Sequence, residues 1–164
     1  MSAAAAAGSF RHILVATDGS PRSVHAVRVA AELARAQHAR LTVFNARALD
    51  LVHYPPWKGQ AAPSPQETHY REILRRESDA VLAAATSAAK NAGVACETAS
   101  IDSDEPWRAI VATATGLGCD LIVMASHGRH GIDAVVLGSE TLKVLGHSSI
   151  PVMVTHDTDP MTAA

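Results

Sequence analysis

The sequence has few aromatic residues, few cysteines and no marked excess of either charge. Phenylalanine, tyrosine and tryptophan make up 4% of the 164 residues, and the formal net charge is −2. With so small a net charge, the chain lacks the excess of positive charge that would attract nucleic acid or an anionic membrane surface. Cys96 and Cys119 are far apart and form no Cys-x-x-Cys motif. We therefore expect buried thiols in a reducing, cytoplasmic compartment rather than a disulfide.

Long apolar segments are also missing, and no stretch of the sequence approaches the length needed to span a membrane. The first residues are rich in alanine but lack the basic start and bulky apolar centre of a signal peptide. We predict disordered tails at residues 1–10 and 157–164. Between the tails there is no break in composition and no internal repeat, which predicts a single domain over residues 11–156.

Several motifs that would identify an enzyme are absent. The sequence contains no Gly-x-x-x-x-Gly-Lys-Ser/Thr, no Gly-x-Gly-x-x-Gly after the first apolar run and no Gly-x-Ser-x-Gly. Their absence argues against a P-loop NTPase, a dinucleotide-binding domain and an α/β-hydrolase. His127 and His130 have no third ligand at a convincing spacing, so no metal site is expected.

What the sequence does have is a regular alternation of apolar runs and amphipathic stretches. Runs typical of strands occur at residues 12–17, 41–46, 94–101, 121–124 and 151–155. Helices are predicted from Ser20-Pro21 onward, over residues 67–91, from residues 104–106 to 116–118, and over residues 140–145. The proline-rich residues 47–66 predict a long loop. This alternation predicts one α/β domain with a parallel sheet and right-handed crossovers.

The segment from Met124 to Thr141 carries the strongest functional signal. The fourth strand leads into Met124-Ala125-Ser126-His127-Gly128, and after nine residues Gly138-Ser139 opens the last helix. A glycine-bearing loop between a strand and a helix brings free backbone N–H groups close to phosphate. Asp18 follows the first strand, and ligands of parallel sheets bind at the carboxyl ends of strands. Asp18 and the glycine loop would therefore meet if the first and fourth strands are neighbours.

These motifs resemble the universal stress protein family. The resemblance rests on Thr17-Asp18-Gly19-Ser20, residues 120–128, Gly138-Ser139 and Ile150-Pro151-Val152, and it covers about residues 10–155. It implies a five-stranded parallel sheet of order 3-2-1-4-5 with helices on both faces, Rossmann-like and similar to adenine nucleotide α-hydrolases. It also implies a homodimer paired through the last strand, around Val152–Thr155. The nucleotide-binding branch has Gly-x-x-Gly, nine residues, then Gly-Ser/Thr, and Ala125 stands where its first glycine is expected.

By matching position, the resemblance assigns Asp18 a contact to the ribose or base and Ala46 a backbone contact to adenine. The residues around 124–128 would surround the sugar and first phosphates, and residues 138–141 would lie at the distal phosphates. The complete predicted nucleotide site is Ala16, Thr17, Asp18, Ala46, Met124, Ala125, His127, Gly128, Arg129, Gly138, Ser139, Glu140 and Thr141.

Structural alternatives stand beside these assignments. Asp18 could simply form an Asx-turn before the first helix, and the glycines could merely shape a surface loop. In the functional assignment, by contrast, Ser139 caps the last helix while the N–H groups of its neighbours face an anion. Glu140 suits the first turn of a helix but would repel a γ-phosphate, so its side chain should point to solvent or face a divalent cation such as Mg²⁺.

We therefore predict a cytoplasmic, homodimeric stress-response protein that binds ATP or AMP and acts as a nucleotide-dependent regulator rather than an enzyme. A slow ATPase is one rival. A dimeric interaction scaffold without nucleotide is the other, and Ala125 is the best reason for it. Neither a nucleic acid nor a membrane is expected as a partner, and the sequence does not identify a downstream protein.

Overall fold

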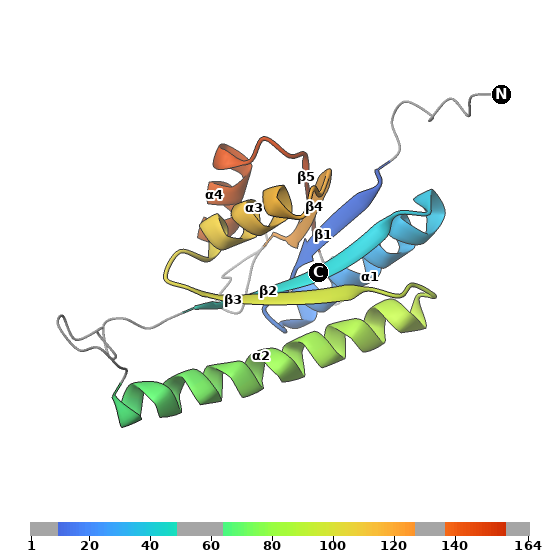
Figure 1. Ribbon diagram of the computed structural model, residues 1–164. Helices are drawn as coiled ribbons and strands as arrows, with labels where there is room; N and C mark the ends of the chain where they lie inside the picture. The colour runs from blue at the N-terminus through green and yellow to red at the C-terminus, as the bar shows by residue number, and fades with distance from the viewer. Residues whose placement is uncertain (1–9, 49–63, 127–136, 157–164) are drawn as a thin grey trace, which may run out of the picture.

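The computed structural model describes residues 10–48, 64–126 and 137–156. Five parallel strands form one sheet in the order β3-β2-β1-β4-β5 (Figure 1). This confirms the predicted sheet and strand order. Along the chain the elements are β1 (His12–Ala16), α1 (Pro21–Gln37), β2 (Arg40–Ala48), α2 (Pro65–Asn91), β3 (Glu97–Ser103), α3 (Pro106–Gly116), β4 (Leu121–Ala125), α4 (Ser139–His147) and β5 (Val152–Thr155).

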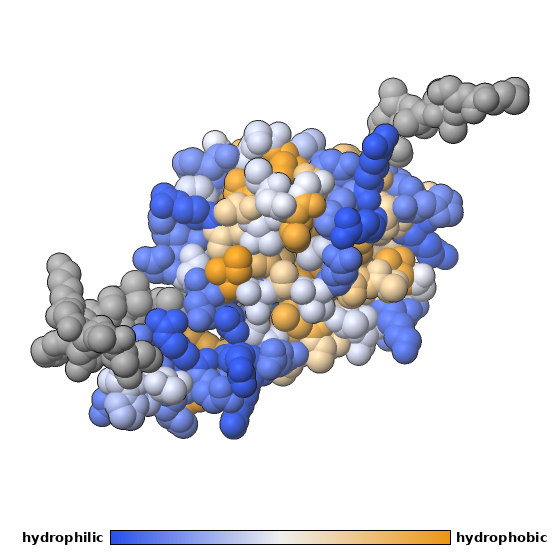
Figure 2. Space-filling model, viewed as in Figure 1, coloured by the Kyte–Doolittle hydropathy of each residue, from blue (hydrophilic) through white to orange (hydrophobic). Residues whose placement is uncertain are grey.

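Two helices cover each face of the sheet, because the buried strand residues alternate between two apolar clusters. Val15, Val43 and Val123 pack with alanines of α1 and α2 in one cluster. Leu14, Phe44 and Ile122 pack with α3 and α4 in the other. Figure 2 shows hydrophilic residues dominating the surface around α2, whereas apolar and polar residues mix over α3 and α4. Within the described ranges, no helix is both long and apolar enough to cross a membrane.

Some element boundaries differ from the sequence-based ones. β2 continues to Ala48 and β3 to Ser103, because these two strands remain paired up to that point. α2 begins at Pro65 rather than residue 67, since Ser64 caps it by accepting a hydrogen bond from Glu67 N–H. Residues 49–63 of the predicted loop lie outside the described residues, as do residues 1–9 and 157–164.

The amino edge of the sheet is closed by contacts within the chain. The Asp120 carboxylate accepts hydrogen bonds from the backbone N–H groups of Arg11 and His12. The His12 ring is buried between the carbonyl of Leu117 and the hydroxyl of Thr42. Burial raises the pKa of the Cys119 thiol to about 11, and the negative charge of Asp120 adds to the shift. This thiol is therefore neutral at physiological pH and a poor nucleophile.

Candidate functional site

Two strands that lead into predicted site residues, β1 and β4, lie side by side in the sheet. The two strands are direct neighbours, with Val15 paired to Val123. The loop after β1, which contains Asp18, and the chain after β4 consequently leave the same edge of the sheet. The condition that the sequence set for bringing Asp18 near the glycine loop is thus met by the strand order.

The loop between β1 and α1 is held by its own side chains. The Asp18 carboxylate accepts a hydrogen bond from Ser20 N–H at 3.0 Å, which is the Asx-turn that the structural alternative predicted. Thr17 is buried, and its hydroxyl lies 2.9 Å from the Ser23 hydroxyl. Gly19 has φ of +80°, a conformation that favours glycine. Asp18 is half-buried in this turn.

Asn45 links the end of β2 to this loop, although sequence reasoning did not select it. Its side-chain amide donates a hydrogen bond to the Thr17 carbonyl at 2.8 Å, and Thr17 N–H donates to the Phe44 carbonyl at 2.9 Å. Asn45 is buried and directly precedes the half-buried Ala46. An asparagine inside an apolar run is the signal that could have identified it, because a buried amide needs a partner.

The side chains of Met124 and Ala125 face opposite sides of the sheet. Met124 packs in the cluster under α3 and α4, and Ala125 packs in the cluster under α1. The Ala125 methyl group, which replaces the expected glycine, is therefore buried in the core. The Ala125 carbonyl accepts a hydrogen bond from the hydroxyl of Thr141 at 3.0 Å, so the hydroxyl of this predicted site residue is already used within the chain.

A backbone hydrogen bond joins the chain leaving β4 to the chain entering α4. Gly138 N–H donates to the Ser126 carbonyl at 2.7 Å, and Ser126 N–H donates to the Thr155 carbonyl at 2.9 Å. Three predicted site residues, His127, Gly128 and Arg129, lie outside the described residues. Among the described residues, no group of three histidine, cysteine, aspartate or glutamate side chains could hold a metal ion.

The first turn of α4 has no side-chain cap. Its N-cap residue is Gly138, whose backbone is extended, and Ser139 is the first residue of the helix rather than its cap. In the described part of the chain, no acceptor is found for the N–H groups of Ser139, Glu140 and Thr141. Unpaired N–H groups at the start of a helix are favourable positions for an anion.

The Glu140 side chain is held by two groups of the chain itself. One of its carboxylate oxygens accepts a hydrogen bond from Trp107 N–H in the first turn of α3, at 2.8 Å. The other lies 3.0 Å from the Lys143 ammonium group. Glu140 therefore ties the start of α4 to the start of α3, instead of pointing freely into solvent.

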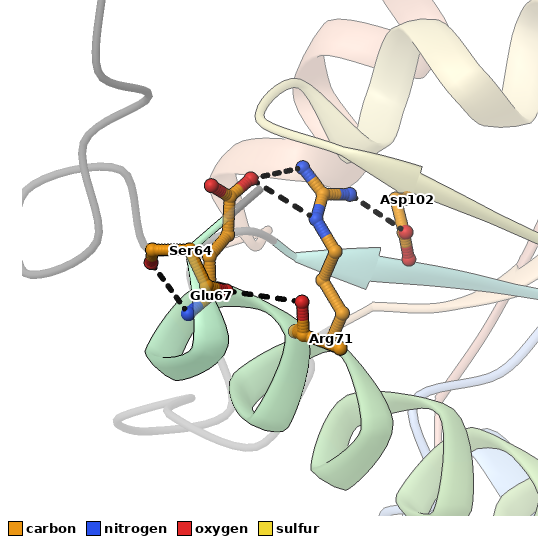
Figure 3. Close-up of polar contacts among 5 residues, drawn as sticks. Ser64, Glu67, Arg71 and Asp102 are labelled. Carbon is orange, nitrogen blue, oxygen red and sulfur yellow. Dashed lines mark hydrogen bonds and ion pairs between the residues drawn. The ribbon is translucent and has the colours of Figure 1, made fainter. Parts of the chain in front are cut away.

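An ion-pair cluster lies at the same edge of the sheet, on β2, β3 and α2. Asp102 Oδ1 lies 2.5 Å from Arg47 Nε, and its Oδ2 lies 3.3 Å from Arg71 Nη1. Arg71 also pairs with Glu67 at 3.0 Å (Figure 3). Both arginines are thus engaged with carboxylates of the chain itself.

Comparison with known proteins connects this architecture to one family. The model of the universal stress protein family matches residues 9–156. A curated universal stress protein of Thermus aquaticus, from the 3′ region of the QAH/OAS sulfhydrylase gene, is 32% identical over 145 residues. The match covers 88% of this chain and 98% of that relative.

Solved structures agree with the fold. A crystal structure of a universal stress protein in complex with cAMP has a TM-score of 0.64 and 26% identity, covering 90% of this chain and 98% of that one. The universal stress protein of Archaeoglobus fulgidus in complex with dAMP has a TM-score of 0.61 and 23% identity. That match covers 88% of this chain and 96% of that one.

Proposed function

The chain belongs to the universal stress protein family, and we propose that it binds an adenine nucleotide at the carboxyl edge of β1 and β4. In this proposal the Asp18 carboxylate accepts hydrogen bonds from the ribose or base, and the backbone at Ala46 contacts adenine. The first turn of α4 holds phosphate. The remaining predicted residues, including Gly128, belong to the same proposed site.

The uncapped start of α4 is the observation that carries this proposal. Three N–H groups there have no acceptor in the described part of the chain, and they share an edge with the Asp18 loop. A phosphate would satisfy those donors and the positive end of the helix dipole together. Similar folds in complex with cAMP and dAMP support an adenine nucleotide as the ligand class.

A regulator fits this site better than an enzyme does. The sequence has no P-loop lysine to reach a γ-phosphate. We therefore propose nucleotide-dependent regulation by ATP or AMP, with Mg²⁺ accompanying ATP, and little or no turnover. A slow ATPase remains the rival, and its signature would be phosphate release that stops when Asp18 is replaced. The cytoplasmic location stays a prediction from the sequence.

Calorimetric titration of the purified protein with AMP and with ATP, each with and without Mg²⁺, tests the proposal. We expect saturable binding of at least one nucleotide with a stoichiometry near one per chain. Extraction of freshly purified protein should also release adenine nucleotide. Absence of heat with every ligand at high micromolar protein would instead support the interaction scaffold without nucleotide.

We also propose that two copies pair through β5, as predicted for Val152–Thr155. β5 is an edge strand next to β4, and its valines are only half-buried. The nearby helix α4 exposes Leu142 and Leu145.

Light scattering during gel filtration should give a dimer for the natural protein and a monomer for Val154→Lys. Ile73→Lys on α2 is the matched control, because Ile73 is also an exposed apolar residue and should leave the dimer intact.

A further inference from the structure

The Glu140 carboxylate lies where the N-terminal ends of two helices meet. Glu140 belongs to the first turn of α4, and its carboxylate accepts a hydrogen bond from Trp107 N–H in the first turn of α3. α3 lacks a cap of its own, because the side chain of its N-cap residue Glu105 accepts no hydrogen bond from the first turn of the helix. Glu140 supplies that cap from the neighbouring helix, so the chain itself provides an anion at this point.

A carboxylate in this position changes what the first turn of α4 offers to a ligand. Each helix start carries roughly half a positive charge, and a full negative charge beside both of them offsets much of the attraction for another anion. The Lys143 ammonium group donates a hydrogen bond to the second oxygen of the carboxylate, and its positive charge restores part of the attraction for an anion. The strength of phosphate binding at α4 therefore depends on the balance of this Glu140–Lys143 pair.

Three arginines toward this edge are already paired with carboxylates. Arg47 and Arg71 contact Asp102. Arg108 on α3 pairs with Glu105 at 2.8 Å. These arginines would have to leave their partners to neutralise additional phosphate groups, which costs the interactions they now make.

We propose that Glu140 is a specificity-determining residue that makes the site favour a nucleoside monophosphate over a triphosphate. This inference rests on the proposed nucleotide site. A triphosphate carries more negative charge than a monophosphate, so repulsion from a carboxylate held in place by Trp107 N–H penalises it more. A divalent cation bound to the triphosphate would reduce the penalty.

The decisive variant is Glu140→Gln, which keeps an oxygen that can accept from Trp107 N–H but removes the charge. AMP and ATP are titrated calorimetrically into the natural protein and the variant, in EDTA and at low salt. The natural protein should bind AMP more tightly than ATP. The variant should bind ATP about fivefold more tightly and AMP less than about twofold more tightly, with both changes shrinking in high salt. Lys143→Gln should change the ratio in the opposite direction.

Glu72→Gln on α2 is the matched control. The Glu72 side chain is 38% exposed and pairs with arginines, and that of Glu140 is 37% exposed and pairs with a lysine. Both substitutions remove one negative charge, but α2 lies on the other face of the sheet, so Glu72→Gln should leave the AMP-to-ATP ratio unchanged. Thermal unfolding of each variant verifies the fold.

The outcomes separate this inference from the function on which it rests. If the natural protein binds nucleotide and Glu140→Gln leaves the ratio of AMP to ATP affinity unchanged, Glu140 does not determine specificity, but the proposed nucleotide site is retained. A natural preference for ATP in EDTA would also overturn the specificity role. If no protein in the series binds AMP or ATP, the proposed function fails and this inference with it.

Discussion

Helices α1 and α4 both begin at the carboxyl edge of the sheet, one after β1 and the other after β4, but their first turns are satisfied differently. α1 is capped by the Ser20 hydroxyl, which accepts a hydrogen bond from Ser23 N–H at 3.2 Å. α4 has Gly138 at the equivalent position and no side-chain cap. The first turn of α1 is thus capped by a side chain of the chain itself, whereas within the described residues the first turn of α4 has donors that a ligand could use.

The neighbouring contacts extend this contrast. Around the start of α1, the hydroxyls of Thr17 and Ser23 contact each other, and Asn45 holds the Thr17 carbonyl. Around the start of α4, the hydroxyl of Thr141 and the carboxylate of Glu140 also have partners, but neither of them accepts from the backbone N–H groups of the first turn. The side chains of α4 thus fix the position of the helix without capping it.

The largest effect should come from giving α4 the cap that it lacks. Gly138→Asp places a carboxylate where it can accept from the first-turn N–H groups, which we expect to lower nucleotide affinity about a hundredfold, or about 2.7 kcal/mol. The extended backbone of Gly138 suits any residue, so stability should rise by a few tenths of a kcal/mol. Calorimetric titration and thermal unfolding measure the two effects.

Gly138→Ala is the control for this substitution, because it adds a Cβ but no acceptor. Its effect on affinity should be clearly smaller. If Gly138→Asp binds nucleotide as well as the natural protein does, the start of α4 is not the phosphate site.

Asp18→Asn tests whether the loop before α1 contributes to the same site. The amide oxygen can still accept from Ser20 N–H, so stability should change little. The lost charged hydrogen bonds to the ligand should weaken nucleotide binding about thirtyfold, or about 2 kcal/mol. Asp79→Asn on the exposed face of α2 should leave the measured Kd unchanged. Equal Kd values for Asp18→Asn and the natural protein would remove Asp18 from the site.

Ala125→Gly restores the glycine of the family pattern at the end of β4. Because the methyl group is buried in the core, we expect a loss of about 1.5 kcal/mol of stability, from lost burial and added backbone freedom. Nucleotide affinity should stay within about twofold, since a core methyl does not obstruct a ligand. Urea unfolding and calorimetric titration give the two values. A large gain in affinity would mean that the methyl faces the ligand after all.

Ser20→Ala has the smallest expected effect on stability and binding taken together. It should lower stability and leave affinity unchanged, whereas Gly138→Asp should raise stability and lower affinity. Removing the cap of α1 should cost about 1 kcal/mol of stability. Nucleotide affinity should be unaffected, because the donors exposed at α1 are not those assigned to phosphate. Urea unfolding and titration of the variant provide the measurements, and a raised affinity, from the N–H donors freed at α1, would make the two helix starts parts of one phosphate site.

Local sequence was sufficient where a structural feature depends on neighbouring residues. The pair Ser20-Pro21 predicted the start of α1, because the cap and its donor are three residues apart. Ser64-Pro65 repeats that pattern and caps α2 in the same way. The sequence nevertheless places the start of α2 two residues late, because Pro65 also fits the proline-rich loop before it. The extension of β2 to Ala48 was missed because it depends on pairing with β3.

The alternation of apolar and amphipathic segments determined that the chain forms an α/β domain, and the motifs around Asp18, at residues 120–128 and 138–139 and at residues 150–152 determined its family resemblance. Only the tertiary structure decided which polar groups near the motif are already bonded. Trp107 holds the Glu140 carboxylate from 33 residues away, and Ala125 holds the Thr141 hydroxyl from 16 residues away. Such partners meet only through the packing of helices on a sheet of a given strand order, which spacing along the chain does not encode.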